Sequence, residues 1–149
     1  MKNAILLGLV ILAAQAAEQV TFEKKRLEIE GHSLSVDVAK SEEQLEHGLM
    51  FRKKLGSDEG MLFIYAQEAP RTFWMKNTFI PLSIGFFNRS KELVDVQDMV
   101  PVVSEQQVKV PIYKSASPAQ YAVEVNRGWF HKNKIKKGAR FELHEKARP

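Results

Sequence analysis

Short segments in which apolar and polar residues alternate recur along the chain, and they restrict its fold more than any other feature. Residues 20–29 and 34–38 alternate on either side of a glycine turn, and residues 82–86 and 93–99 do so on either side of a polar turn. Successive side chains of a strand point to opposite faces, so alternation is typical of a strand with two different surroundings. Two such segments joined by a short turn indicate a hairpin. The sequence therefore predicts two antiparallel hairpins.

Two short helices are expected between the strands. Ser41 and Gln44 have the spacing of a capping box, and the two glutamates after Ser41 suit the positive end of a helix dipole. Gly48 is well placed to end this helix, because glycine readily adopts the left-handed conformation found there. Residues 128–135 indicate one or two further helical turns.

The remaining segments complete a mainly β-structured chain. Residues 60–65 are nearly all apolar, as in a strand buried on both faces, and residues 119–125 and 140–144 predict two more strands. Residues 102–118 have no sustained period and contain two prolines, which indicates a long connection that could act as a lid. We predict an α+β fold with a mainly antiparallel, barrel-like or strongly twisted β-sheet and two short helices.

The N-terminal residues have the pattern of a signal peptide. Lys2 is followed by an apolar run over residues 4–14 and by the cleavage pattern Ala14-Gln15-Ala16. This run is shorter than the roughly 20 residues that a transmembrane helix needs, although an uncleaved N-terminal anchor is the alternative. We therefore expect a signal peptide at residues 1–16 and a single domain at residues 17–149, periplasmic or secreted, with no transmembrane segment after cleavage.

The sequence lacks the motifs of several kinds of functional site. The chain has no cysteine, so it can form no disulfide, thiolate nucleophile or zinc–thiolate site. Its four histidines show no metal-ligand spacing, and it has no serine-hydrolase elbow, phosphate-binding loop or dinucleotide-binding turn. We expect no metal and no cofactor, while a catalytic pair built from distant residues stays possible.

Basic residues outnumber acidic ones, and the formal net charge is +4. They occur in small groups at residues 24–26, 52–54 and 132–137. For an exported protein, such groups favour lipid head groups or wall polymers as partners over nucleic acid. The alternative is an ordinary solvated basic surface.

The stretch from Thr72 to Pro81 is unusual because it combines large apolar side chains with a lysine and an asparagine. In a strand, Trp74 and Lys76 project to one face, opposite the residues that anchor the strand in the core. Trp74 then offers a flat apolar platform beside a positive charge, and Asn77 adds a donor and an acceptor. Such a surface suits a sugar ring or a small anionic ligand. The alternative is that Trp74 belongs to the core and Lys76 only extends to solvent or pairs with an acid.

Two more charged residues are candidates for the same site. Glu124 lies on the strand face opposite Val123 and Val125, so it is either a solvent carboxylate or a partner of Lys76. A Lys76–Glu124 pair in a cleft would shift the pKa of both groups, as in acid–base sites. Arg52 could hold a carboxylate or phosphate through two parallel hydrogen bonds.

Several separate motifs occur together in a fixed order over residues 27–141. They are Glu43-Gln44, Gly48-Leu49-Met50-Phe51-Arg52, Gly60-Met61-Leu62-Phe63, Phe73-Trp74-Met75-Lys76-Asn77-Thr78 followed by Ile80-Pro81-Leu82, Tyr121-Ala122-Val123-Glu124-Val125, and Ile135-Lys136-Lys137-Gly138. In order and spacing they resemble the family called domain of unknown function 192. The resemblance implies a small, often exported, largely β-structured protein, and it implies no activity. The family pattern usually has an acid where Ser83 stands and often one where Ala139 stands.

The leading hypothesis is a non-catalytic binding domain of the cell envelope. Its predicted site consists of Arg52, Trp74, Lys76, Asn77 and Glu124, with residues 102–118 covering a small molecule or a wall saccharide. One alternative is an envelope hydrolase or lyase that uses Lys76 as base and Glu124 as acid. Another alternative is a module that binds a protein partner through an exposed apolar patch. The sequence leaves the ligand, the oligomeric state and the choice between binding and catalysis open.

Overall fold

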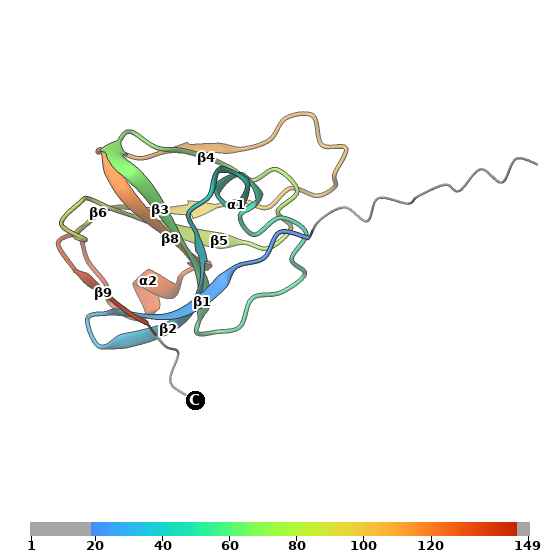
Figure 1. Cartoon of the computed structure of the whole chain (residues 1–149). Coiled ribbons are helices and arrows are strands. Elements are labelled where there is room, and N and C mark those ends of the chain that lie inside the picture. Colours follow the sequence, from blue (N-terminus) through green and yellow to red (C-terminus); the bar gives the residue numbers. More distant parts are fainter. Residues whose placement is uncertain (1–18, 146–149) are drawn as a thin grey trace, which may run out of the picture.

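The structure, a computed structural model, describes residues 19–145, and the predicted signal peptide at residues 1–16 lies outside this range (Figure 1). The described residues form nine strands and two short helices. In chain order these are β1 (Glu23–Ile29), β2 (His32–Ala39), α1 (Glu42–His47), β3 (Glu59–Ala69), β4 (Thr72–Trp74), β5 (Leu82–Phe87), β6 (Leu93–Met99), β7 (Ile112–Lys114), β8 (Ala119–Asn126), α2 (Trp129–Lys132) and β9 (Phe141–His144).

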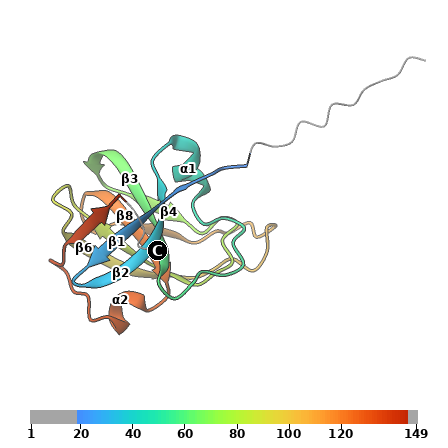
Figure 2. The same ribbon diagram turned by 60° about the horizontal axis from the view of Figure 1, so that its bottom comes forward.

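Seven strands form one mixed sheet in the order β6-β5-β8-β3-β2-β1-β9, and β4 pairs with β7 in a separate ribbon. Only the β2–β3 pair is parallel among these strand pairs. The large sheet curls, and α2 lies at one end of the curl (Figure 2). Its two edges meet where the Leu93 N–H donates to the Ala139 carbonyl at 2.8 Å and Glu92 bridges to Arg140. The predicted α+β class with a mainly antiparallel, barrel-like sheet is confirmed.

The inside of the curl holds the first core. Alternate residues of the strands point inward, and the apolar side of α2 fills the space between them through Trp129 and Phe130. Phe87 and Phe141 meet edge to face there, with ring centroids 5.1 Å apart. The remaining buried members are Leu27, Ile29, Leu34, Val36, Val38, Leu62, Leu93, Val123, Val125, Ile135 and Ala139.

A second core lies on the outer face of β3, β5 and β8. The β4–β7 ribbon covers it, and Phe73 from β4 makes edge-to-face contacts with Phe63 and Phe86 at centroid distances of 5.0 and 5.7 Å. All six residues of β5 are therefore buried. A strand covered on both faces needs apolar side chains on both, and this explains why β3 begins with the continuous apolar run predicted from the sequence.

Helix α1 begins with the predicted capping box. The Gln44 N–H donates to Ser41 Oγ at 3.2 Å, and the Ser41 N–H donates to Gln44 Oε1 at 3.2 Å. The Gln44 side chain also donates to the Thr21 carbonyl at 2.7 Å, which ties the chain before β1 to the helix. Gly48 follows at a φ of 50°. This end of α1 faces the Trp74 region, so the helix positions one wall of the candidate site.

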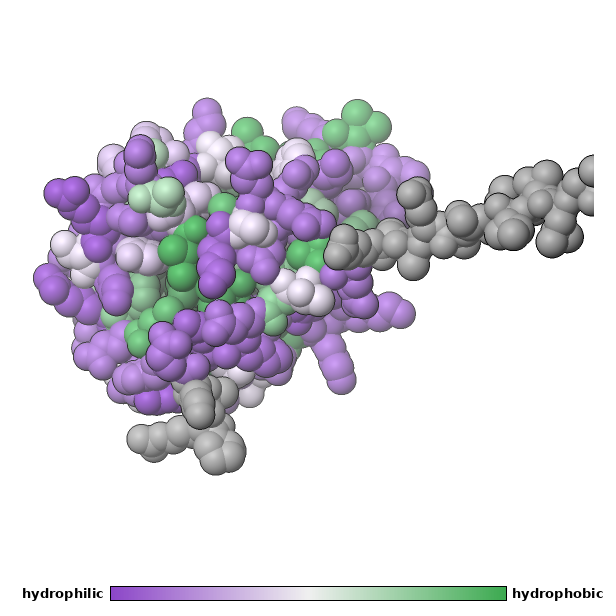
Figure 3. Space-filling view, in the orientation of Figure 1, coloured by the Kyte–Doolittle hydropathy of each residue, from purple (hydrophilic) through white to green (hydrophobic). Residues whose placement is uncertain are grey.

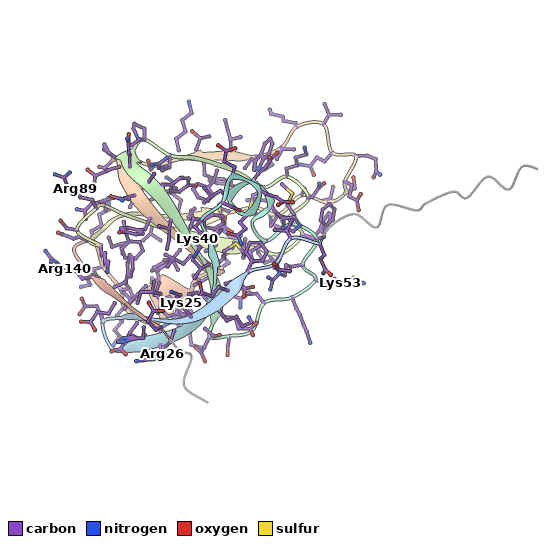
Figure 4. The ribbon with its side chains drawn as sticks, in the orientation of Figure 1. Lys25, Arg26, Lys40, Lys53, Arg89 and Arg140 are labelled. Atoms are coloured by element: carbon purple, nitrogen blue, oxygen red, sulfur yellow. The ribbon has the colours of Figure 1, made fainter. Side chains whose placement is uncertain are left out.

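The basic side chains do not gather into one patch. Figure 4 shows Lys25, Arg26, Lys40, Arg89 and Arg140 spread over the molecule. Several have acidic neighbours: Arg26 Nη1 lies 2.8 Å from Glu28, Lys25 Nζ lies 3.3 Å from Glu145, and Arg140 Nη2 lies 3.5 Å from Glu92. The charges of these three side chains are therefore compensated by neighbouring acids. In residues 19–145, no helix is long and apolar enough to cross a membrane.

Candidate ligand-binding groove

The short strand β4 presents Trp74 at the surface. Phe73 and Met75 are buried in the second core, whereas 43% of Trp74 is exposed and Lys76 is also exposed. Lys76 Nζ lies 5.0 Å from the centroid of the Trp74 ring, a distance suited to a cation–π contact. The predicted alternation of faces is therefore present, and the alternative of a core tryptophan is wrong.

The strand ends sooner than the alternation indicates, because the backbone turns after Trp74. Asn77 has a φ of 51°, and its carbonyl accepts a hydrogen bond from the Phe51 N–H at 2.8 Å. Phe51 itself has a φ of 62°, although half of its side chain is exposed. A bulky residue in the left-handed region is strained and is found mostly at turns and functional sites. The loop after α1 and the turn after β4 are thus held together at the edge of the groove.

The loop between β6 and β7 forms one side of the groove. A cavity of about 260 Å³ lies between this loop and the surface of Trp74, Lys76 and Asn77. Within the predicted connection 102–118, only the three residues of β7 form a strand. The Met75 N–H donates to the Pro111 carbonyl at 3.1 Å, and the Val102 N–H donates to the Thr78 carbonyl at 3.1 Å. Both ends of the covering loop are therefore fixed to the Trp74 segment, while its movement as a lid stays a prediction.

The groove continues on the other side of Lys76 and Asn77. A cavity of about 220 Å³ lies between these two residues and the α1 residues Glu43, Glu46 and His47. A larger hollow of about 450 Å³ adjoins it and shares Val20, His47 and Met50 as lining residues. Trp74, Lys76 and Asn77 thus form the middle of a continuous groove, called here the Trp74 groove, that runs from the β6–β7 loop past α1.

Arg52 lies in the outermost hollow, away from Trp74. Its guanidinium is paired with the buried Asp37 carboxylate, which also accepts from Lys24 Nζ at 2.9 Å. The structure therefore supplies a specific partner for Arg52 within the chain. Arg52 can border a ligand that extends along the groove, but most of its charge is compensated by Asp37.

Glu124 is buried, with 5% of its surface exposed. On β8 it lies opposite Met61 of β3 and Ile84 of β5, so it points to the second core rather than to solvent. The prediction that Glu124 faces away from the first core is correct, but that face is covered by β4 and α1. A small cavity of about 30 Å³ lies beside Glu124 and is bordered by Trp74 and Thr78. Burial raises the pKa of Glu124 to about 8.

Lys76 and Glu124 do not form an ion pair in residues 19–145, and no hydrogen bond within that range reaches the Glu124 carboxyl. They border different cavities, and Trp74 is common to both. The geometry expected of a lysine–glutamate acid–base pair is thus not present between these side chains. In the described part of the chain, no group of three or more histidine, cysteine, aspartate or glutamate residues could hold a metal ion.

The two positions where the family pattern has acids lie away from the groove. Ser83 is buried on the inner face of β5, donates to Asp98 Oδ1 at 2.5 Å, and accepts from the Gly128 N–H at 2.9 Å. Ala139 belongs to the first core. Because neighbouring residues of a strand point to opposite faces, Ser83 and Glu124 are separated by the sheet.

The contacts of Ser83 give a stability prediction that is separate from the groove. Replacing Ser83 with alanine leaves the partly buried Gly128 N–H without its acceptor, so we expect a loss of about 1–2 kcal/mol in the free energy of unfolding. Urea unfolding would measure it, with the exposed Ser90→Ala variant as the control. An unchanged midpoint in Ser83→Ala would contradict the structural role.

Sequence reasoning missed several residues of the groove. His47, Met50, Thr78 and Val108 border its cavities, but none was predicted as a site residue. Met50 and Thr78 lie within motifs of the family pattern, and Val108 lies in the connection predicted to cover the ligand, so each had a signal in the sequence. His47 had none, and it comes near Lys76 because α1 packs beside the turn after β4.

Comparison with known proteins identifies similar sequences and structures. The family model DUF192, described as "Uncharacterized ACR", matches residues 25–143. The chain is similar to a crystal structure of a "putative transcription regulator" from Sinorhizobium meliloti 1021, with 31% identity, a TM-score of 0.75, and coverage of 84% of this chain and 97% of that chain. It is also similar to a protein of unknown function from Novosphingobium aromaticivorans DSM 12444, with 30% identity, a TM-score of 0.71, and coverage of 78% and 83%. No curated protein matches the chain.

Proposed function

Because this chain belongs to the DUF192 family, as its motifs predicted, and that family is described as uncharacterized, we propose a function from the groove itself. We infer that the protein is a non-catalytic binding domain of the cell envelope. Its Trp74 groove holds a small molecule or a short stretch of saccharide. Trp74 supplies the stacking surface, Lys76 and Asn77 supply polar contacts, Arg52 lies at one end of the site, and Glu124 lines the small cavity beside Trp74.

One observation carries the proposal: an exposed tryptophan ring lines the cavity under the β6–β7 loop, and the lysine beside it borders both this cavity and the next one. A large aromatic side chain is usually withdrawn from water when no ligand needs it, because burying it is strongly favourable. Trp74 is instead held at the surface by its buried neighbours Phe73 and Met75. A rigid, half-exposed ring of this kind suits the apolar face of a sugar.

The charges in the groove favour a ligand that is uncharged or only partly anionic. Lys76 is positive, whereas Glu43, Glu46 and Glu105 add negative charge around it. A polyanion would meet these carboxylates, and a simple cation would meet Lys76 at the stacking surface. A neutral saccharide with a small anionic substituent is compatible with both signs.

We also propose that residues 1–16 are a signal peptide and that residues 17–149 act as a single domain in the periplasm or outside the cell. The apolar run and the Ala14-Gln15-Ala16 pattern support this location. We do not extend the transcription-regulator description of the Sinorhizobium protein to this chain. Nucleic-acid binding favours a clustered basic face, whereas several basic side chains here are dispersed and paired with acids.

A second candidate function is binding of a protein partner by the β6–β7 loop. Val103 and Val108 are 89% and 99% exposed, and Val100 is also exposed. Figure 3 shows apolar surface at the tip of this projecting loop. Exposed apolar groups that lie close together are common at interaction sites. The two candidate functions differ in the residues on which binding depends. Saccharide binding needs Trp74, whereas binding of a protein partner needs the exposed Val103 and Val108 of the loop.

Replacing Trp74 with alanine is expected to weaken saccharide binding by about two- to twelvefold, because stacking on an aromatic ring contributes about 0.5–1.5 kcal/mol. The measurement is isothermal titration of the purified protein with a tetramer of N-acetylglucosamine. A thermal-shift screen of wall fragments, anionic lipid head groups and metal ions accompanies it.

Two control variants make the result specific. Val103→Ala removes an exposed apolar side chain that does not border the groove, and Lys53→Ala removes an exposed charge outside it. Both should bind as the wild type does. Tetramer binding that survives unchanged in Trp74→Ala would contradict the groove proposal, and so would the absence of a ligand-induced shift with every probe.

A further inference from the structure

The small cavity beside Glu124 is a distinct part of the Trp74 groove. It lies beneath Trp74 and is walled mainly by the apolar side chains of Leu45, Leu49 and Phe63. Its volume of about 30 Å³ exceeds the roughly 10–15 Å³ that one water molecule requires, so it can hold one polar group. Glu124, on β8, is the acidic residue of the large sheet that lines this cavity.

Although 95% of Glu124 is buried, its carboxyl makes no hydrogen bond within residues 19–145, and its oxygens are not among the fully enclosed atoms that lack a partner. They therefore open to the cavity that Glu124 lines. A carboxyl in that position needs a hydrogen-bonding group from the cavity, because polar groups withdrawn from bulk water are almost always hydrogen-bonded. It is suited to exchange hydrogen bonds with a group that enters from the groove.

Burial keeps this carboxyl neutral. No cation is paired with it, and burial raises its pKa to about 8, so it is mostly protonated at pH 7. A protonated carboxyl can donate one hydrogen bond and accept another. The ionisable groups nearest to it are Glu46 and His47 of α1, which line the same cavity, Tyr65 of β3, and the Asp37–Arg52 pair beyond Met61. Lys76 lines a different cavity.

We propose that the Glu124 cavity is a subsite that binds one uncharged hydroxyl group of the ligand held in the Trp74 groove. A hydroxyl both donates and accepts, so it matches a neutral carboxyl at both of its bonding positions. The ligand class is thereby narrowed to polyols and sugars whose ring stacks on Trp74 while one hydroxyl points inward. This inference rests on the proposed function, and it assigns Glu124 the selection of a neutral group over an ammonium group.

The direct test uses two small probes of similar size, ethylene glycol and methylammonium chloride. The ¹³C signal of the Glu124 carboxyl is followed against pH in the purified protein, with and without each probe. Ethylene glycol is expected to raise the titration midpoint, because it stabilises the protonated form, and methylammonium is expected to leave it unchanged. A midpoint lowered by methylammonium would overturn the proposal in favour of an ammonium site, and no change with either probe would overturn it as well.

The saccharide tetramer provides the second readout. Its dissociation constant for the wild type should rise about tenfold between pH 7 and pH 9, because the protonated fraction of a group with a pKa of about 8 falls by that factor. In Glu124→Gln the neutral amide persists at both pH values, so binding should be retained without this pH dependence. Equal wild-type affinity at both pH values would overturn the subsite.

The two proposals can fail separately. If the tetramer does not bind but ethylene glycol raises the Glu124 midpoint, the saccharide function fails and the hydroxyl subsite stands. If the tetramer binds through Trp74 but neither probe changes the Glu124 titration, the groove stands and the subsite is overturned. Glu124→Leu removes both hydrogen-bonding positions and should abolish the response to ethylene glycol, monitored by the Trp74 indole signal.

Discussion

Replacing Glu124 with glutamine is expected to raise the free energy of unfolding at pH 7 by about 3 kcal/mol. The unfolded chain ionises this carboxyl near its ordinary pKa of 4.5, whereas burial raises the pKa in the folded protein to about 8. Between these values the folded protein binds the additional proton, so this group's contribution to stability falls as pH rises. At pH 7, which is 2.5 units above the pKa of 4.5 in the unfolded chain, the stability lost is 2.5 times about 1.4 kcal/mol.

The shape of the pH profile makes this prediction specific. Below pH 4.5 the glutamate is neutral in both states, so wild type and Glu124→Gln should differ little. The difference should grow up to pH 8 and then stay constant at about 5 kcal/mol. Urea unfolding across this range would measure it, with Glu142→Gln on the exposed edge of β9 as a control that stays near zero. A constant offset at every pH would contradict a buried, neutral Glu124.

Replacing Gly60 with alanine is expected to destabilise the fold by about 3 kcal/mol or more. A Cβ atom at this position would lie 2.5 Å from the backbone carbonyl oxygen of Glu124 and 3.2 Å from Val125 Cγ1. The first contact is with backbone, which cannot turn away as a side chain can. Strands β3 and β8 would have to separate near the middle of the large sheet, where both faces are packed.

Gly56→Ala is the matched control for this substitution. A Cβ at Gly56 would lie 3.0 Å from the side chain of Glu59, which is exposed and can swing away by giving up its 2.9 Å hydrogen bond from the Gly56 N–H. We expect a change within about 1 kcal/mol for this variant. Chemical denaturation of both variants gives the comparison, and similar unfolding midpoints for the two would show that the sheet can relax around the new methyl group.

Local patterns predicted most elements of the fold because each of them is encoded within a few neighbouring residues. The hairpin at Gly31 follows from alternation around a flexible turn, and the start of α1 follows from the Ser41–Gln44 capping box. The continuous apolar run after Gly60 predicted a strand buried on both faces, and the first part of β3 is such a strand. The β4–β7 ribbon was not predicted, since its two short strands lie far apart in the sequence.

The candidate site was predicted in part for the same reason. Trp74 and Lys76 share a face because they are two residues apart, and the structure retains this pairing with the ring and ammonium 5.0 Å apart. The surroundings of Glu124 and Arg52 could not be predicted, because burial and ion pairing depend on which distant elements cover each strand. Asp37, the partner of Arg52, is 15 residues away in sequence.

The sequence by itself determined the class of fold, the family and the exposed pairing of Trp74 with Lys76, since periodicity and nearest neighbours decide these features. Only the tertiary structure decided that Glu124 is buried and neutral, that Arg52 is compensated by Asp37, and that α1 and the β6–β7 loop flank Trp74. The physical reason is that solvation and electrostatic environment are properties of assembled surfaces. A strand pattern states which side chains share a face, and the packing of other elements decides whether that face meets water.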